Sequence, residues 1–171
     1  DDTRPVIVAF DASPPAEAAV RAAASLFADR QLLVVSVWEP GLALAVMSYP
    51  DTTGMSYGTP TSEDIAMVDR AQRTHAEAAA EAGARMARDL GATAQALSVP
   101  DSADTAETLA AVAQQHSAAA VVVGSRGLGD VKSKLLGSTS RRLMHRTHLP
   151  VLVVRVDPAA DDQPTTSADS R

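Results

Sequence analysis

Five short apolar runs, each separated from the next by a longer segment, constrain the fold of this chain more than any other feature. The runs cover residues 5–10, 31–38, 93–99, 119–123 and 150–156. They have the length of strands, and the segments between them carry helical signals, so the pattern alternates strand with helix. Such alternation predicts right-handed crossovers and a parallel sheet. We therefore expect one α/β domain over residues 1–156, with helices on both faces of a five-stranded sheet.

The expected helices begin at residues that can cap them. Their predicted ranges are residues 14–29, 62–90, 105–116 and 138–146. Ser13, Ser62 and Asp104 stand where N-caps belong, because their side-chain oxygens can accept from first-turn N–H groups. Glu107, three residues after Asp104, would complete a capping box.

Apolar residues recur at helical spacing in the first two of these helices. In the first, Ala18, Ala22 and Leu26 share one face. In the second, the repeat runs through Ile65, Val68, Ala71, His75, Ala79, Ala82, Met86 and Leu90. We interpret Met67 and Met86 as core fillers rather than as cofactor ligands.

Composition narrows the classes of function. Hydrophobic residues make up 46% of the 171-residue chain but aromatic residues only 3%, so the core must consist of Ala, Val and Leu. Cysteine is absent, which excludes disulfides and thiol catalysis and is compatible with a cytoplasmic location. A net charge of −6 without a dense basic face argues against nucleic-acid binding. No apolar run is long enough to span a membrane.

Two segments lack regular patterns. Glycine and proline interrupt residues 41–61, which we interpret as a mobile surface loop, with a ligand lid or a dimer-packing element as alternatives. Residues 157–171 are polar and aperiodic, and we expect a disordered tail there.

The segment after the fourth apolar run carries the clearest functional signal. A strand, a glycine-rich loop and a helix N-terminus follow one another between residues 118 and 146. Glycine main-chain N–H groups have no Cβ beside them, and the first helical turn adds free donors, so a phosphate group can bind here. The spacing is neither that of a P-loop nor that of the dinucleotide-binding fingerprint. A turn-rich connection without a ligand is the alternative.

The glycine spacing resembles that of a known family. Two residues separate Gly124 from Gly127, and nine residues lead from there to Gly137 and Ser138. This pattern resembles the ATP-binding branch of the universal stress protein family. The strand that runs into Asp11, the run LLVVSVWEP and the closing run PVLVVR are similar to the same family, so the resemblance covers about residues 5–156.

The resemblance implies a fold that is Rossmann-like and similar to the adenine nucleotide alpha hydrolases. The implied strand order is 3-2-1-4-5. In that order the switch point of the parallel sheet lies between the first and fourth strands. Ligands bind at such a switch point in open α/β sheets. Asp11 and Gly124 would face each other across it.

The resemblance also implies roles for individual residues. Asp11 would accept from a ribose hydroxyl or help to hold Mg²⁺, and Ala9 would line the pocket through its backbone. The main-chain N–H and C=O of Val37 would meet the adenine edge.

The phosphate end of the implied site lies in the glycine loop and the last helix. Gly124 and Gly127 would let the backbone wrap the ribose and α-phosphate, with Arg126 between them over the sugar or phosphates. The outer phosphates would take donors from the first turn of the helix, namely Gly137, Ser138 and Thr139.

Position 12 departs from the family pattern, because Ala12 stands where the family usually has glycine. If the backbone there takes a positive φ, alanine costs on the order of 1 kcal/mol.

Other chemistry is poorly supported by the sequence. His145 and His148 are close in sequence, but a zinc site needs three or four converging ligands. Ser125 follows a strand without the flanking glycines of a hydrolase nucleophile. We assign no catalytic residue.

The sequence therefore predicts an adenine-nucleotide-binding module for stress response or signalling, which binds ATP with Mg²⁺ and hydrolyses it slowly or not at all. Nucleotide occupancy would tune contacts with a protein partner. The alternatives are a slow ATPase, a module for AMP or cyclic AMP, and a protein-interaction domain without nucleotide. The resemblance implies a homodimer that pairs the last strands, Val151–Val156.

Overall fold

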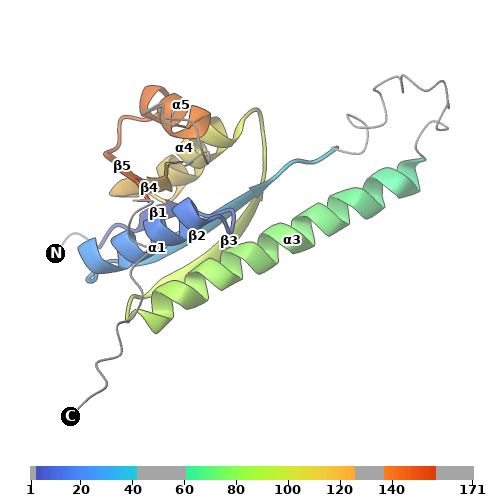
Figure 1. The fold of residues 1–171 in the computed structure, drawn as a ribbon. Helices are drawn as coiled ribbons and strands as arrows, with labels where there is room; N and C mark the ends of the chain where they lie inside the picture. The colour runs from blue at the N-terminus through green and yellow to red at the C-terminus, as the bar shows by residue number, and fades with distance from the viewer. Residues whose placement is uncertain (1–2, 42–60, 126–136, 157–171) are drawn as a thin grey trace, which may run out of the picture.

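In the computed structural model, which describes residues 3–41, 61–125 and 137–156, the chain forms a five-stranded parallel sheet (Figure 1). Its order is β3-β2-β1-β4-β5, so the expected order is confirmed. The strands are β1 (Val6–Ala9), β2 (Leu32–Trp38), β3 (Ala94–Pro100), β4 (Ala120–Gly124) and β5 (Val151–Val154). The mixed pattern of β3 suits its place at one edge, and β5 forms the other edge.

Two layers of helices cover the sheet. The helices of the described residues are α1 (Pro14–Leu26), α3 (Ser62–Asp89), α4 (Thr105–Gln115) and α5 (Ser138–Arg146). Buried alanines of α1 and α3 pack with Val6 and Val8 on one face. Leu109 of α4 and Leu143 of α5 pack with Ile7 on the other. The expected two-sided covering is therefore confirmed.

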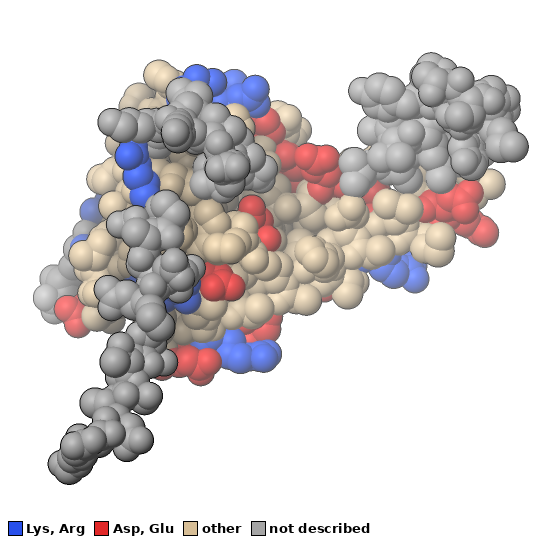
Figure 2. Space-filling model, in the orientation of Figure 1, with Lys and Arg blue, Asp and Glu red and all other residues tan. Residues whose placement is uncertain are grey.

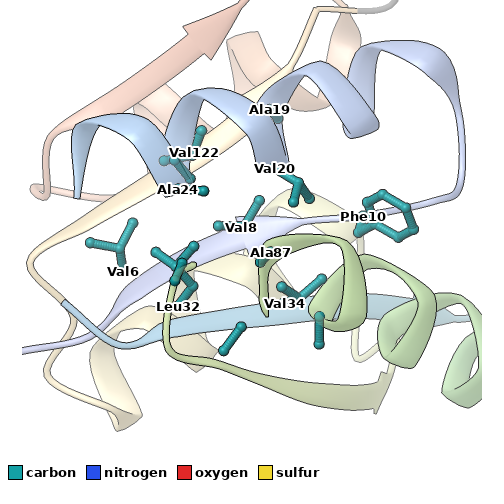
Figure 3. Close-up of a cluster of buried hydrophobic side chains, with 14 of the residues drawn as sticks. Val6, Val8, Phe10, Ala19, Val20, Ala24, Leu32, Val34, Ala87 and Val122 are labelled. Carbon is teal, nitrogen blue, oxygen red and sulfur yellow. The ribbon is translucent and has the colours of Figure 1, made fainter. Parts of the chain in front are cut away.

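The core is built from small side chains, as the composition requires. Figure 3 shows the cluster on the α1 and α3 face, where Val6, Val8 and Phe10 follow one another along the chain. The ring of Phe10 is buried beside Gly83 of α3, where an added Cβ would lie only 2.9 Å from it. Phe10 therefore belongs to the core.

The predicted helix faces were largely wrong in phase, although Ala79 of the predicted α3 face is buried. Leu26 of α1 is 63% exposed, whereas the buried residues of that helix are Ala16, Ala19, Val20, Ala23 and Ala24. In α3 the buried face consists of Ala76, Ala79, Ala80, Gly83, Ala84 and Ala87. Met67 is 66% exposed and is not part of the core, whereas Met86 is partly buried and packs against the core. Alanine on every side of a helix leaves the periodicity without a clear phase.

The predicted cap of α3 is wrong by one residue, and for α4 the cap is confirmed but the capping box is not. Thr61, not Ser62, caps α3, because its hydroxyl accepts from the Asp64 N–H while the Asp64 carboxylate accepts from Thr61 in return. Asp104 caps α4 by accepting from the Glu107 N–H at 2.9 Å. The Glu107 carboxylate lies 3.4 Å from Arg146 of α5 instead of closing the box.

Helix α3 reaches beyond the sheet in Figure 1. All of its buried residues lie from Ala76 onward, so its first half has little packing beneath it. In the part of the chain that the structure describes, no helix combines the length and apolar composition needed to cross a membrane. The interpretations of residues 42–60 and of the tail 157–171 lie outside the described residues.

Candidate nucleotide site

A crevice of about 330 Å³ opens at the carboxyl ends of β1, β2 and β4, where the strand order reverses. Helices of both layers contribute to its walls. Six of the predicted residues line it, namely Ala9, Asp11, Val37, Gly124, Gly137 and Thr139. The topology therefore brings together residues from opposite ends of the sequence.

The main-chain N–H and C=O groups of Val37 in β2 point toward this crevice. The last bond from β1 to β2 runs from the Phe10 N–H to the Val35 C=O at 2.8 Å, and β1 ends at Ala9. The N–H and C=O of alternate residues in a strand point to the same side. Those of Val37 therefore point to the side on which β1 has already ended, where they can meet a ligand.

Asp11 lies at the mouth of the crevice and is exposed. One of its carboxylate oxygens accepts from both the main-chain N–H and the hydroxyl of Ser13. The Ser13 oxygen in turn accepts from the Ala16 N–H at 3.4 Å, which caps α1. Asp11 thus supports the start of α1 as well as facing the crevice.

Gly124 has a packing reason of its own to be glycine. A Cβ at this position would lie 2.4 Å from the main-chain oxygen of Pro15, so α1 could not approach the end of β4 as it does. The close approach is needed whether or not a ligand is present.

The N-terminus of α5 lacks the side-chain cap that the other described helices have. Gly137 occupies the N-cap and has no side chain with which to bond the first turn, whereas Ser13, Thr61 and Asp104 cap α1, α3 and α4. First-turn N–H groups without protein acceptors attract anions, as does the positive end of the helix dipole. As far as the described residues go, the start of α5 therefore suits a phosphate group.

Ser138 lines a second pocket of about 260 Å³ beside the crevice, and not the crevice itself. Thr139 belongs to both cavities, so the two adjoin at the start of α5. Arg142 reaches the second pocket from α5 and lies 3.7 Å from Asp104 of α4. Figure 2 shows basic side chains over the α5 region with acidic ones close by.

The pKa of Asp104 lies below its ordinary value of 3.8. The main cause is the hydrogen bond from the Glu107 N–H, which lowers the pKa, whereas partial burial of the carboxylate raises it. The Ala106 N–H and the guanidinium groups of Arg142 and Arg146 lower the pKa further. The carboxylate therefore stays ionised while it caps α4. The cap also holds α4 beside α5 through Arg142.

Carboxylates surround the site, but they do not form a metal cage. Asp11 and Glu39 line the crevice, and Asp101 and Asp104 line the adjoining pocket. Among residues 3–41, 61–125 and 137–156, no three His, Cys, Asp or Glu side chains form a group able to hold a metal ion. A cation here would need ligand oxygens from the bound molecule. Predicted site residues Arg126 and Gly127 lie outside the described residues.

The structure adds residues to the site that the sequence did not indicate. Trp38 and Glu39 follow Val37 at the end of β2, so their place in the chain was a usable signal. Gln72 reaches the crevice from α3, and nothing in the sequence pointed to it. The hydroxyl of Ser140, which is 2% exposed, donates to the Gly124 C=O at 3.4 Å and joins α5 to β4.

The backbone at position 12 takes a positive φ, the conformation for which the family usually has glycine. Ala12 has a φ of 60°, in the left-handed region that alanine disfavours. The strain lies between Asp11 and Ser13, directly beside the crevice.

Comparison with known proteins gives a family. The model of the universal stress protein family matches residues 3–155. A universal stress protein of Mycolicibacterium smegmatis is 33% identical over 159 residues, which are 91% of this chain and 49% of that protein. The chain thus spans about half the length of this curated relative.

Solved structures share the fold. A universal stress protein from Archaeoglobus fulgidus in complex with dAMP is 20% identical, with a TM-score of 0.57 over 87% of this chain and 95% of that one. A family protein from Arabidopsis thaliana with AMP bound is 17% identical, with a TM-score of 0.56 over 97% and 99%. At these identities the likeness extends to the fold alone.

Proposed function

The chain belongs to the universal stress protein family, and from this premise we propose that its crevice binds an adenine nucleotide. The observation that carries the proposal is the crevice itself, which brings Asp11, Val37 and Thr139 together at the switch point of the sheet. Its volume of about 330 Å³ falls within the range of small-molecule sites. Relatives with dAMP and AMP support an adenine nucleotide as the ligand class.

The proposed pose runs from β2 to α5. The adenine edge meets the main-chain N–H and C=O of Val37, and the ribose lies near Asp11. The phosphates reach the first turn of α5, where Gly137, Ser138 and Thr139 offer N–H and hydroxyl donors. The adjoining pocket, which Ser138 lines, has room for the outer phosphates of ATP.

We propose Mg²⁺ as the companion of ATP, because the site is rich in carboxylates. Asp11, Glu39 and Asp101 would repel a bare triphosphate. Magnesium commonly binds through one or two carboxylates together with nucleotide phosphates. Asp11 would supply the protein ligand, and the ion would screen the phosphate charge.

Binding without rapid hydrolysis is the function that this arrangement supports. Main-chain amides and hydroxyls at a helix N-terminus hold phosphates without activating a water molecule. Occupancy would then tune contacts with a protein partner. Phosphate release above a no-protein blank would instead favour the slow ATPase.

Calorimetric titration with ATP, ADP, AMP and cyclic AMP, each with and without Mg²⁺, tests the proposal. We expect one nucleotide per chain and stronger ATP binding with Mg²⁺. A variant with Ser138→Ala and Thr139→Val should bind ATP less tightly and AMP unchanged, since only outer phosphates use these hydroxyls. No binding at millimolar nucleotide would favour a protein-interaction domain.

We also propose a homodimer through β5. This strand is at an edge of the sheet and is rich in Val, which invites pairing with a second copy. Pairing around a two-fold axis would extend the sheet across two chains.

A further inference from the structure

Gln72 is placed to contact a ligand in the crevice from a direction that the pose above does not use. It lines the crevice from α3, which packs on the face of the sheet opposite to α4 and α5. Trp38 and Glu39 at the end of β2 line the same crevice. Its side chain is half-buried, although it precedes the segment of α3 that packs on the sheet. Gln72 lies four residues before Ala76, so it continues the buried face of α3 beyond the packed segment and toward the crevice.

Two hydrogen bonds hold this wall of the crevice. The Asp69 carboxylate, one turn before Gln72, accepts from the Gly41 N–H at 2.7 Å and so fixes the end of the β2 segment on α3. The Asp101 N–H donates to the Trp38 C=O at 2.7 Å and joins the same segment to the end of β3. These bonds fix the end of the β2 segment against α3 and against the end of β3, and so hold the wall of the crevice that Gln72 lines.

The chemistry of a glutamine amide suits one edge of adenine. The amide donates through its NH₂ and accepts through its C=O, and adenine offers the N6 amino donor beside the N7 acceptor. Guanine presents two acceptors, O6 and N7, on the same edge and cannot accept this pairing. Val37 would serve the other edge of the base through its main chain, which leaves the N6–N7 edge to another group.

We propose that Gln72 pairs with the N6–N7 edge of the base and makes the site select adenine over guanine. The inference rests on the proposed nucleotide binding and assigns its base specificity. It adds a residue of α3 to a site otherwise built from strand ends and from α1, α4 and α5.

The test combines a change in the protein with a change in one ligand atom. ATP, GTP and 7-deaza-ATP, which lacks the N7 acceptor, are titrated into the wild type, Gln72→Ala and Gln114→Ala. The last variant is a matched control, because Gln114 is an exposed glutamine in the last turn of α4. Trp38 is the only tryptophan of the chain and lines the crevice, so its fluorescence reports binding, with calorimetry as a second readout.

We expect the wild type and Gln114→Ala to bind 7-deaza-ATP about fivefold to tenfold less tightly than ATP, and GTP less tightly still. Gln72→Ala should bind ATP and 7-deaza-ATP equally. Equal binding of the two by the wild type, or unchanged discrimination in Gln72→Ala, would overturn the role of Gln72 and leave nucleotide binding intact. A wild type that binds none of the three by either readout would overturn both proposals.

Discussion

At position 12 an alanine holds the left-handed conformation, with a φ of 60°, between two residues that shape the crevice. We predict that Ala12→Gly raises the free energy of unfolding by about 0.5–1 kcal/mol. Relief of left-handed strain, about 1–2 kcal/mol, exceeds the added flexibility of the unfolded chain, about 0.4–1 kcal/mol. Urea denaturation measures the change, with Ala78→Gly in the exposed face of α3 as a control that should lose about 1 kcal/mol. A loss of stability in Ala12→Gly would show that the loop does not need a positive φ.

Gly124 gives a second prediction at the scale of the residue. Gly124→Ala should lower the free energy of unfolding by about 2–3 kcal/mol, because its Cβ meets the rigid main chain of Pro15. Gly91→Ala is the comparison, since its Cβ meets nothing within 4 Å and only its φ of 88° costs about 1 kcal/mol. A loss in Gly124→Ala no larger than that in Gly91→Ala would contradict the prediction and mean that α1 moves aside at a small cost. Weak nucleotide binding by Gly124→Ala would therefore not by itself locate a phosphate.

At the scale of the element, the cap of α4 should make stability depend on pH. The pKa of Asp104 is lower in the folded chain than its ordinary value of 3.8. The ionised carboxylate therefore stabilises the fold at pH values above 3.8, and this stabilisation is lost as the pH falls through the pKa of the folded chain. Thermal unfolding should show Asp104→Ala less stable than the wild type at pH 7, with the difference shrinking below about pH 4. Asp104→Asn keeps an acceptor for the cap but cannot titrate, so it should keep more of the neutral-pH stability. A wild-type advantage over Asp104→Ala that is constant down to pH 2.5 would contradict the account.

An element could be predicted from the sequence where its apolar residues differ clearly from the residues around them. The five strands followed from runs such as Ala119–Val123, which differ sharply from their flanks. Their order came from the family resemblance and not from the runs. The faces of α1 and α3 did not follow, because alanine occurs all round both helices. The sequence showed that Ala12 replaces the usual glycine, but it did not show whether the backbone there takes a positive φ. Gln72 and Ser140 reach the site through tertiary packing, which leaves no local signal.

At the scale of the whole molecule, the edge strand β5 makes the proposed dimer testable by one substitution. The C=O groups of Pro150 and Val154 accept from the N–H groups of Val121 in β4 and of Ser125 directly after it, at 2.9 and 2.7 Å. Even-numbered residues of β5 therefore face the sheet. The N–H of Val153 therefore points outward, and Val153→Pro removes it while the bonds to β4 remain. We predict a monomer in sedimentation velocity for Val153→Pro and a dimer for Val153→Ala. A wild type that sediments as a monomer at micromolar concentration would contradict the proposed dimer.

The central claim is that the crevice above β1, β2 and β4 holds an adenine nucleotide. A crystal structure of the chain grown with millimolar AMP tests it most directly. We expect the base against the main chain of Val37 and beside Gln72, with the ribose and the phosphate between Asp11 and Gly124. A crevice without nucleotide, or AMP bound elsewhere on the molecule, would contradict the account.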